Sequence, residues 1–390
     1  MDNFDVVVIG GGATGTAAAL AAARAGARVA LVRRGPGAAA LSAGGWRDAP
    51  PAPVREALAT AGLELAACDD ALPHPDGTVA TCEVASVTHV TAALTAGAPA
   101  TIVCGIAGLP GFHAPALARL WSAAAALPED ALRPATITLD DMPAAGWSPV
   151  SLAALLDRQP ERLAGALARI VRDSGAERVI LPAVLGLAGG TRVRDAIAAA
   201  ARVPTGEALG TAPSVPGWRL DRAFQQVTID AGVQMIAGRV VGCDTRDGAI
   251  RNIRIEGRTA PVAVAAGCHV LATGKYIAGG ITANAEFEEP ALGCDVALER
   301  FARTIDDPGA ALVLTDAVRS EPQPVLAAGV RIDTEGRPLT PAGDVYLTNV
   351  FVAGSVRAGV EAAALGLGAA MHDGWAAGER AASLAAVAGR

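Results

Sequence analysis

The sequence predicts an α/β fold, in which a mostly parallel sheet is flanked by helices and a second α/β domain is inserted into the chain. Two observations support this prediction. Short apolar runs rich in β-branched residues alternate with alanine-rich helical stretches, and several of the runs end in glycine. Such runs are typical of strands buried on both faces of a parallel sheet, and their alternation with helices is typical of βαβ units. A chain of 390 residues is long enough for roughly two or three domains.

Composition excludes several classes of protein. With 52% hydrophobic and 18% charged residues, the chain is too apolar for an intrinsically disordered protein. Its net charge of −7 and its 3% of aromatic residues argue against nucleic acid as a partner, because such surfaces are basic and often stack bases on aromatic rings. The six cysteines form no Cys-x-x-Cys pair, so we expect no metal ion and no iron–sulfur cluster in this chain.

The expected location is the cytoplasm, with contact to the inner face of the membrane only through a partner subunit. Scattered cysteines are typical of a reducing compartment, and the N-terminus has no basic region of the kind that opens a signal peptide. No Asp, Glu, Lys or Arg lies between Glu83 and Arg119, a gap long enough for a membrane-spanning helix. Because Pro99, Pro110 and Pro115 interrupt the gap, we expect no span there.

The N-terminal residues have the pattern of a βαβ unit that binds a dinucleotide. An apolar, β-branched strand is expected at residues 5–9, followed at once by a glycine-rich turn. A helix is expected at residues 16–25 and a second strand at residues 28–32. A strand, a glycine turn, a helix and a strand in this order are the context that a dinucleotide fingerprint requires.

The glycine-rich turn has the spacing Gly10-x-Gly12-x-x-Gly15. In a Rossmann-like domain the first glycine permits the tight turn, the second lets the backbone approach a pyrophosphate, and the third lets the helix pack close to the strand. The N–H groups of Ala13, Thr14 and Gly15 then face the phosphates at the positive end of the helix dipole. The alternative is a glycine-rich turn between strand and helix that binds nothing.

The end of the second strand lacks the acid that normally holds the ribose hydroxyls of an adenosine. Arg33 and Arg34 stand there instead. An arginine can hold a phosphate, such as a 2′-phosphate, so both residues are candidate cofactor contacts. Two other interpretations remain open: the adenosine half is bound loosely or is absent, or both arginines are solvated surface charges.

The middle of the chain alternates strands and helices by itself, which predicts an inserted α/β domain at residues 96–205. The flanking residues 1–95 and 206–390 then form one discontinuous nucleotide-binding domain. Gly175 is expected to end the longest helix of the insertion, because glycine readily adopts the left-handed conformation found there. The expected elements are strands at residues 101–106, 135–139 and 178–181 and helices at residues 114–126, 152–174 and 192–201.

The last part of the chain has a mixed pattern. A helix is expected at residues 220–231, and Asp247-Gly248 is typical of the turn of a β-hairpin. The closing residues after Gly354 read as a helix studded with glycine. The expected strands are an antiparallel meander at residues 233–236, 240–245 and 250–256, followed by single strands at residues 269–272 and 349–353.

Two of these late strands end in glycine, as the first strand does. Together with the N-terminal fingerprint this is the layout of flavoproteins with two dinucleotide domains. Their N-terminal βαβ unit holds the ADP half, and a C-terminal segment returns to the flavin ring. A helix N-terminus at the flavin would stabilise the negative charge of the reduced ring. The predicted cofactor contacts in these segments are Thr273, Gly274, Gly354, Ser355, Gly366 and Gly368.

Segments spread through the chain resemble a flavoprotein subunit of anaerobic glycerol-3-phosphate dehydrogenase, which is related to the fumarate reductase and succinate dehydrogenase flavoproteins. The Leu-Pro-Ala motif at 181–183 and the Pro-Ser-Val-Pro-Gly motif at 213–217 are more diagnostic than the fingerprint. By this resemblance, Ser42 and Gly44 of the segment after the second strand contact the cofactor. The other matching segments begin at Arg34, Cys104, Leu271, Gly279, Glu289 and Gly354.

The resemblance implies a flavin-binding subunit that works beside a second flavoprotein subunit and an iron–sulfur subunit, which passes electrons to quinone. The reaction in that family is oxidation of the small molecule sn-glycerol 3-phosphate to dihydroxyacetone phosphate. The subunit that this chain resembles is described as an FMN protein, whereas the fingerprint favours FAD, so we expect FAD with FMN as the alternative. A second hypothesis is a non-catalytic subunit that supports assembly or relays electrons in a related complex with a different substrate.

Oxidation of an alcohol needs a base for the hydroxyl proton, and histidine is the commonest choice. Among the five histidines, His113 follows a glycine turn at the mouth of the inserted domain and is the better candidate. Lys275 follows Thr273-Gly274, where a flavin should lie, and its charge would stabilise the reduced ring. The alternatives are a loop histidine with a structural role and a surface lysine.

Overall fold

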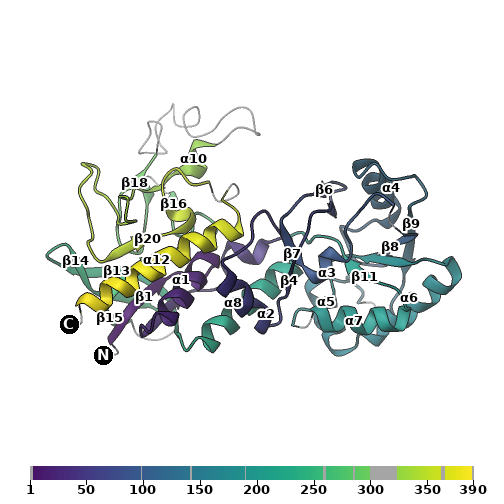
Figure 1. The fold of residues 1–390 in the computed structure, drawn as a ribbon, viewed down its shortest axis with the longest axis horizontal. Helices are drawn as coiled ribbons and strands as arrows, with labels where there is room; N and C mark the ends of the chain where they lie inside the picture. The colour runs from purple at the N-terminus through teal and green to yellow at the C-terminus, as the bar shows by residue number, and fades with distance from the viewer. Residues whose placement is uncertain are drawn as a thin grey trace. The chain divides into compact units, whose positions relative to one another are not determined.

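The structure is a computed structural model that describes residues 3–97, 99–140, 143–188, 190–257, 261–283, 286–298, 323–361 and 365–388 (Figure 1). It divides into two compact units. The first unit comprises Met1–Ala39, Pro50–Val54 and Phe224–Arg390, and the second comprises Ala40–Ala49 and Arg55–Ala223. The insertion expected at residues 96–205 lies wholly within the second unit, which also takes in residues on both sides of it.

The first unit is built on a parallel sheet. Strand β1 (Asn3–Ile9) lies between β2 (Val29–Arg33) and β15 (Val262–Leu271) and runs parallel to both. Strand β12 (Gln234–Ala237) extends the sheet beyond β2, and β20 (Val350–Val352) pairs with β15, again in parallel. This arrangement confirms the predicted βαβ unit and places the carboxyl ends of β1, β15 and β20 side by side.

One predicted pairing is wrong. The sequence predicts that residues 233–236 join an antiparallel meander, but β12 lies beside β2 at the other end of the sheet. The reason is that a helix precedes this strand, and a crossover through a helix returns the chain in the parallel direction. The predicted hairpin itself is confirmed: β13 (Arg239–Arg246) and β14 (Ala249–Glu256) are antiparallel, and Asp247 and Gly248 between them have positive φ angles of 54° and 71°.

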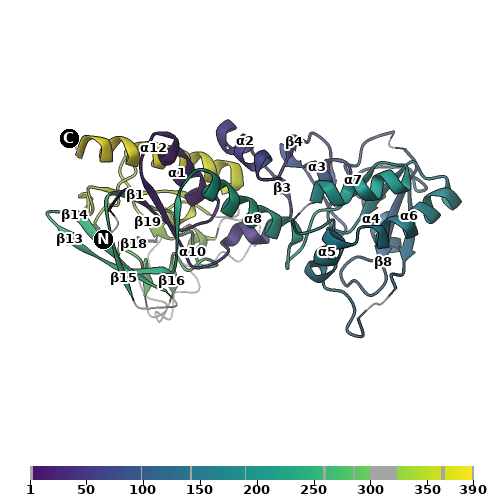
Figure 2. The ribbon, with the colours of Figure 1, turned by 90° about the horizontal axis from the view of Figure 1, so that it is seen from below.

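Helices α1 (Ala13–Arg24) and α12 (Leu367–Ala388) lie side by side against one face of this sheet in both views (Figures 1 and 2). Their backbones approach closely at two glycines of α12 that face α1. A Cβ atom on Gly374 would lie 2.1 Å from the carbonyl oxygen of Thr14, and one on Gly378 would lie 2.2 Å from that of Ala18. Only glycine fits at these two positions, which fixes α12 against the fingerprint helix.

Replacing Gly378 with leucine is therefore expected to destabilise the first unit, although leucine favours a helix more than glycine does. Forcing the two helices apart should cost about 1–3 kcal/mol or more. Urea unfolding measures the loss, and Ala386→Leu, at an exposed position of the same helix, is the control. Equal stabilities of the two variants would contradict the close approach of the helices.

The second unit contains a separate parallel sheet with the strand order β11-β10-β8-β9. Helix α4 packs on one face of the sheet, while α5, α6 and α7 pack on the other. The strands are β8 (Thr101–Ile106), β9 (Leu132–Ile137), β10 (Arg178–Leu181) and β11 (Thr205–Glu207), and the helices are α4 (Ala114–Ala124), α5 (Pro149–Arg158), α6 (Glu161–Ser174) and α7 (Gly190–Ala201).

Two helices of this region differ from the prediction. The single helix expected at residues 152–174 is divided into α5 and α6, because Pro160 has no N–H to continue the hydrogen-bond ladder. Helix α8 (Val215–Asp230) begins earlier than the expected residue 220. Gly175 ends α6 in the left-handed conformation with φ 61°, as predicted.

The remaining elements are short. Strands β3 (Gly45–Trp46), β4 (Leu65–Ala67) and β7 (Val84–Ser86) form a small antiparallel sheet. None of the helices in the described ranges is long and apolar enough to cross a membrane. The other elements are η1 (Ala38–Leu41), α2 (Ala52–Thr60), β5 (Leu72–Pro73), β6 (Val79–Ala80), α3 (Val87–Val90), β16 (Thr282–Ala283), β17 (Phe287–Glu288), β18 (Val296–Ala297), α10 (Pro324–Ala327), β19 (Gly329–Val330) and η2 (Gly354–Val356).

Candidate flavin site

The fingerprint turn has the geometry that its glycines predict. Gly10 has a φ of +113°, and a Cβ atom on it would lie 2.3 Å from the carbonyl oxygen of Ala272. A Cβ atom on Gly15 would lie 1.7 Å from the carbonyl oxygen of Gly10, so α1 packs directly onto the turn. Both glycines are therefore required by the fold, whether or not a ligand is bound.

Gly12 is different, because the space beside it is open. A Cβ atom on Gly12 would meet nothing within 4 Å in the described structure. Gly12 is also the N-cap of α1, so the first turn, which begins at Ala13, has no side-chain cap from its N-cap residue. An uncapped helix N-terminus next to open space fits a pyrophosphate group. Gly12, Ala13, Thr14 and Gly15 would hold the phosphates of a dinucleotide.

The arginines after the fingerprint lie at the end of β2. The Arg33 side chain packs against the turn, since a Cβ atom on Gly11 would lie 2.9 Å from the Cβ of Arg33. The Arg33 carbonyl oxygen accepts a hydrogen bond from the N–H of Gly238, and Arg34 is exposed. Arg33 thus lies beside the predicted phosphate site, and its contact with a cofactor remains a prediction.

Reversing both charges, in the double variant Arg33→Glu and Arg34→Glu, is expected to weaken cofactor binding. A lost charge-assisted hydrogen bond costs about 1.5–3 kcal/mol, and repulsion between the new carboxylates and the phosphates adds to it. The dissociation constant of the cofactor should rise roughly tenfold or more. The control is Arg246→Glu with Arg251→Glu, an equal charge change at exposed positions of the β13–β14 hairpin. An equal dissociation constant in both double variants would identify Arg33 and Arg34 as surface charges.

The C-terminal glycine turn meets the fingerprint helix. Gly354 follows β20 with a φ of +77°, and a Cβ atom on it would lie 2.3 Å from the Oγ1 of Thr14. The carboxylate of Asp373, on α12, accepts a hydrogen bond from the N–H of Gly354 and forms an ion pair with Arg357 at 3.0 Å. Asp373 therefore holds this turn against the N-terminus of α1.

The turn after β15 lies next to the fingerprint turn and the Gly354 turn. A Cβ atom on Gly10 would lie 3.0 Å from the Cα of Thr273, and one on Gly274 would lie 4.0 Å from the Oγ of Ser355. The Thr273 hydroxyl is buried and has no hydrogen-bond partner among the described residues. The structure thus brings together Thr14, Thr273, Gly274, Gly354 and Ser355, at the carboxyl ends of three parallel strands.

Four further predicted cofactor residues belong to other segments of the chain. Gly366 precedes α12 with a φ of +75°, and Gly368 is buried in the first turn of that helix. Ser42 and Gly44 belong to the second unit, where they line a small pocket together with Ser86 and other residues. A contact between the cofactor and any of these four residues remains a prediction.

The two predicted catalytic residues have structural partners. Lys275 is buried, and its Nζ donates hydrogen bonds to the carbonyl oxygens of Leu326, at 2.6 Å, and Val360. Burial lowers the pKa of Lys275 to about 8, although Glu361 opposes this shift. His113 is exposed and caps α4, where its Nδ1 accepts a hydrogen bond from the N–H of Ala116 at 3.3 Å. Their roles in chemistry remain predictions.

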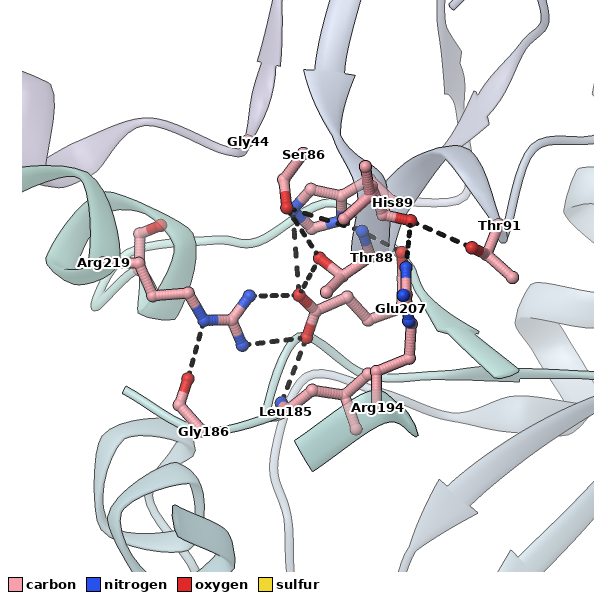
Figure 3. A network of polar contacts seen from close by, with 12 residues as sticks. Gly44, Ser86, Thr88, His89, Thr91, Leu185, Gly186, Arg194, Glu207 and Arg219 are labelled. Atoms are coloured by element: carbon pink, nitrogen blue, oxygen red, sulfur yellow. Dashed lines mark hydrogen bonds and ion pairs between the residues drawn. The ribbon is translucent and has the colours of Figure 1, made fainter. Parts of the chain in front are cut away.

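A buried ion pair in the second unit was not predicted from the sequence (Figure 3). The Glu207 carboxylate, at the end of β11, faces the Arg219 guanidinium of α8 and accepts two hydrogen bonds from it. It also accepts hydrogen bonds from the Thr88 hydroxyl at 2.7 Å and from the N–H of Leu185 at 3.1 Å. Arg219 Nε donates to the carbonyl oxygen of Gly186 at 2.6 Å. The only signal in the sequence was that Glu207 is the single charge between Arg202 and Arg219, and Arg219 itself stands near Asp221 and Arg222.

His89 completes this network. Its Nδ1 lies 3.0 Å from the carbonyl oxygen of Glu207, which can only accept, so Nδ1 carries the proton. Its Nε2 is buried, has no hydrogen-bond partner among the described residues and lies 4.0 Å from the Glu207 carboxylate. A Cβ atom on Gly44 would lie 2.1 Å from this nitrogen. Burial lowers the pKa of His89, while Glu207 raises it less, so the imidazole is neutral. Only glycine fits at position 44 beside this ring.

The comparisons with known proteins agree with the geometry of the first unit. Residues 5–69 match the family described as an FAD binding domain. No curated protein matches the sequence, so the resemblance to anaerobic glycerol-3-phosphate dehydrogenase remains a prediction. Among the described residues, no group of three or more His, Cys, Asp or Glu side chains could hold a metal ion.

Several solved structures are similar to the chain at low identity. A 3-ketosteroid-Δ4-(5α)-dehydrogenase from Rhodococcus jostii is 16% identical over 98% of this chain and 97% of that chain, with a TM-score of 0.39. A flavocytochrome c3 fumarate reductase is 14% identical over 98% and 79%, with a TM-score of 0.41. FrdA of the E. coli quinol fumarate reductase is 13% identical over 100% and 71%, with a TM-score of 0.40. Similarity at this level indicates no substrate for this chain.

The family match and the fold lead to one conclusion. The matched residues contain most of β1 and all of the fingerprint, α1 and β2, which are the parts that form the phosphate site. FAD is therefore the cofactor, as predicted in preference to FMN, and the predicted α/β fold with a Rossmann-like parallel sheet is confirmed. Residues 5–69 of the chain match an FAD binding domain, and the cofactor of this domain is FAD.

Proposed function

We propose that this chain is the FAD-binding subunit of a multi-subunit dehydrogenase that oxidises a small hydroxy compound and passes the electrons through partner subunits to quinone. By the sequence resemblance, the substrate is sn-glycerol 3-phosphate. The observation that supports a redox flavin most directly is the meeting of three glycine turns at the carboxyl ends of β1, β15 and β20. The substrate and the partners rest on the sequence motifs alone.

The residues of the first unit have separate tasks in this proposal. When bound, FAD supplies an acceptor for the hydride of an alcohol carbon. The N–H groups at the start of α1 bind the pyrophosphate, and the missing side chain of Gly12 leaves room for it. Asp373 orients the Gly354 turn through the hydrogen bond to its N–H. The Lys275 ammonium group donates hydrogen bonds to the carbonyl oxygens of Leu326 and Val360 and so connects these two segments. It also places a positive charge directly after the Gly274 turn.

A non-catalytic role in assembly or electron relay is the second candidate. The surroundings of the two proposed catalytic residues favour this role. The Lys275 ammonium group donates hydrogen bonds to two carbonyl oxygens, and His113 is an exposed residue that caps a helix. In this alternative, another subunit removes the hydroxyl proton and the hydride.

Anaerobic titration of the FAD-loaded protein with sn-glycerol 3-phosphate tests the proposal. Loss of the oxidised flavin absorbance in the isolated chain supports a catalytic subunit, and loss only in the presence of the partner subunits supports electron relay. Glycerol, which lacks the phosphate, is the control substrate. An unchanged flavin spectrum in the complete complex would exclude glycerol 3-phosphate as the substrate.

Assembly is a separate expectation of the proposal. The chain should form a stable complex with a second flavoprotein subunit, and such an interface removes roughly 1,200–2,000 Å² or more from solvent. Size-exclusion chromatography with light scattering, on the chain alone and with the partner, measures the mass of the complex. A monomer that turns over substrate at the full rate by itself would contradict a multi-subunit dehydrogenase.

A further inference from the structure

Two cysteine thiols of the second unit lie in contact, although they come from different segments of the chain. Cys68 follows directly after β4, and Cys82 lies between β6 and β7. Both side chains pack in one apolar cluster, which also contains Leu72 and Leu209. The thiol of Cys82 is within hydrogen-bond reach of the thiol of Cys68. The two sulfur atoms are therefore close enough to react with each other.

The backbone explains why the two thiols meet. Strands β4 and β7 are antiparallel, and Ala67 lies opposite Val84. The N–H of Cys68 donates a hydrogen bond to the carbonyl oxygen of Glu83 at 2.9 Å, so the pairing continues past the end of β4. Cys82 is the next residue, and the Cα atoms of such diagonal neighbours lie roughly 6 Å apart. A disulfide needs a Cα separation of about 4.4–6.8 Å, which this backbone provides.

The two thiols differ in their access to solvent. Cys68 is 3% exposed, whereas Cys82 is partly exposed. An external disulfide can therefore reach Cys82, and the buried thiol beside it can then resolve the mixed disulfide. Burial and the neighbouring Cys68 raise the pKa of Cys82 to about 12, so this thiol reacts slowly at neutral pH. We expect the pair to remain reduced during brief exposure to an oxidant and to respond to sustained exposure.

A bond between the two cysteines would close the loop that contains β5 and β6. This loop is attached to the rest of the second unit by two hydrogen bonds. The indole N–H of Trp121, on α4, donates to the carbonyl oxygen of His74 at 2.8 Å, and the N–H of Leu209 donates to that of Pro73 at 2.9 Å. A covalent bond at the base of the loop would restrict the unfolded chain and so stabilise the second unit.

We propose that Cys68 and Cys82 are a redox-sensitive dithiol that a small-molecule disulfide, such as oxidised glutathione, converts into an intrachain disulfide. The Cys82 thiolate attacks one sulfur of the small disulfide, whose S–S bond breaks and releases one glutathione thiolate. The Cys68 thiolate then attacks the Cys82 sulfur of the mixed disulfide and releases the second glutathione. The protein gives up two electrons, which reduce the small disulfide, and its two thiol protons pass to the two glutathione thiolates. This site is separate from the flavin site and does not depend on the proposed substrate.

Peptide mapping of the FAD-loaded chain tests the proposal. The protein is incubated for a long period with oxidised glutathione, its remaining thiols are alkylated, and it is digested without reduction. A protease that cleaves at acidic residues separates the two cysteines, because Asp69, Asp70 and Asp76 lie between them. Mass spectrometry should find the peptides of Cys68 and Cys82 joined, with two hydrogen atoms lost, and the other four cysteines alkylated.

Three variants identify the reacting pair. In Cys68→Ser, Cys82 should stop at the mixed disulfide and keep one glutathione. Cys82→Ser, at the partly exposed position where folding is less at risk, should form no linked peptide. Cys243→Ser removes a partly exposed cysteine of the first unit and is the matched control, in which the linkage should form as in the parent protein.

The thermal midpoint of the second unit provides an independent measurement. Closing a loop of about 15 residues should raise this midpoint by roughly 5–10 °C in the oxidised protein, and Cys82→Ser should show no such rise. Two results would overturn the proposal. One is a parent protein without the linked peptide after an incubation that attaches glutathione to Cys82 in Cys68→Ser. The other is a Cys82 that reacts with oxidised glutathione in neither protein.

Discussion

Gly12→Val should remove FAD from the protein while leaving the fold of the apoprotein intact. The described structure has nothing within 4 Å of a Cβ atom at this position, and the φ of −84° is acceptable for valine. The new side chain would instead occupy the space that the pyrophosphate needs. We expect the dissociation constant of FAD to rise roughly a hundredfold or more, which corresponds to about 2.7 kcal/mol. Flavin absorbance after gel filtration and a titration of the apoprotein with FAD measure the effect.

Gly15→Val provides the contrast. A Cβ atom there would lie 1.7 Å from the carbonyl oxygen of Gly10, so this substitution should destabilise the first unit even without cofactor. The thermal midpoints of the two apoproteins should therefore differ, with that of Gly12→Val close to the parent protein. If Gly12→Val retained its flavin through gel filtration, the pyrophosphate would not lie at the start of α1.

The sequence pattern was sufficient to predict those parts of the fold that depend on residues close together in the sequence. The run at residues 5–9 became β1, with Val6, Val7 and Val8 fully buried, because a continuous apolar run suits a strand covered on both faces. The positive φ angles of Gly10, Gly274 and Gly354 follow from the same local reasoning. The flavin site could be predicted because each of its turns has a local glycine signature.

The parts that were missed depend on residues far apart in the sequence. The helical crossover before β12 determines at which edge this strand joins the sheet. The four residues of β12 itself do not predict that edge. Gly374 and Gly378 read as helix-weakening residues until α1 is known to lie against them. Similarly, an isolated Glu207 and an isolated Arg219 look like surface charges, and only the fold shows that they are buried and paired.

Arg219→Met should be among the most destabilising single substitutions in the second unit. Glu207 is fully buried and Arg219 is 7% exposed, so the substitution would leave a carboxylate in the interior without its cation. Breaking a buried ion pair in this way costs about 3–5 kcal/mol. Urea unfolding at neutral pH measures the loss. Arg254→Met is the matched control, because it removes an exposed ion pair with Asp244, for which we expect a change of about 1 kcal/mol or less.

Removing the second charge should restore much of the lost stability. In the double variant Arg219→Met with Glu207→Gln, the amide oxygen can accept from the N–H of Leu185, while the amide NH2 can donate to the Thr88 hydroxyl. No buried charge is left without a partner. A double variant as unstable as Arg219→Met alone would show that packing of the arginine side chain, and not its charge, stabilises this region.

The pH dependence of unfolding tests the same ion pair independently. Burial alone would raise the pKa of Glu207, but the Arg219 charge and the hydrogen bonds from Arg219 and Thr88 outweigh it and lower the pKa to about 2. Because the native pKa lies below the ordinary glutamate value of 4.5, the carboxylate stabilises the fold above about pH 4.5. This contribution is lost as the pH falls toward 2. In Glu207→Gln the free energy of unfolding should be lower at neutral pH and should fall less steeply between pH 4.5 and 2 than in the parent protein. Parallel pH profiles would show that folding does not lower the pKa of Glu207.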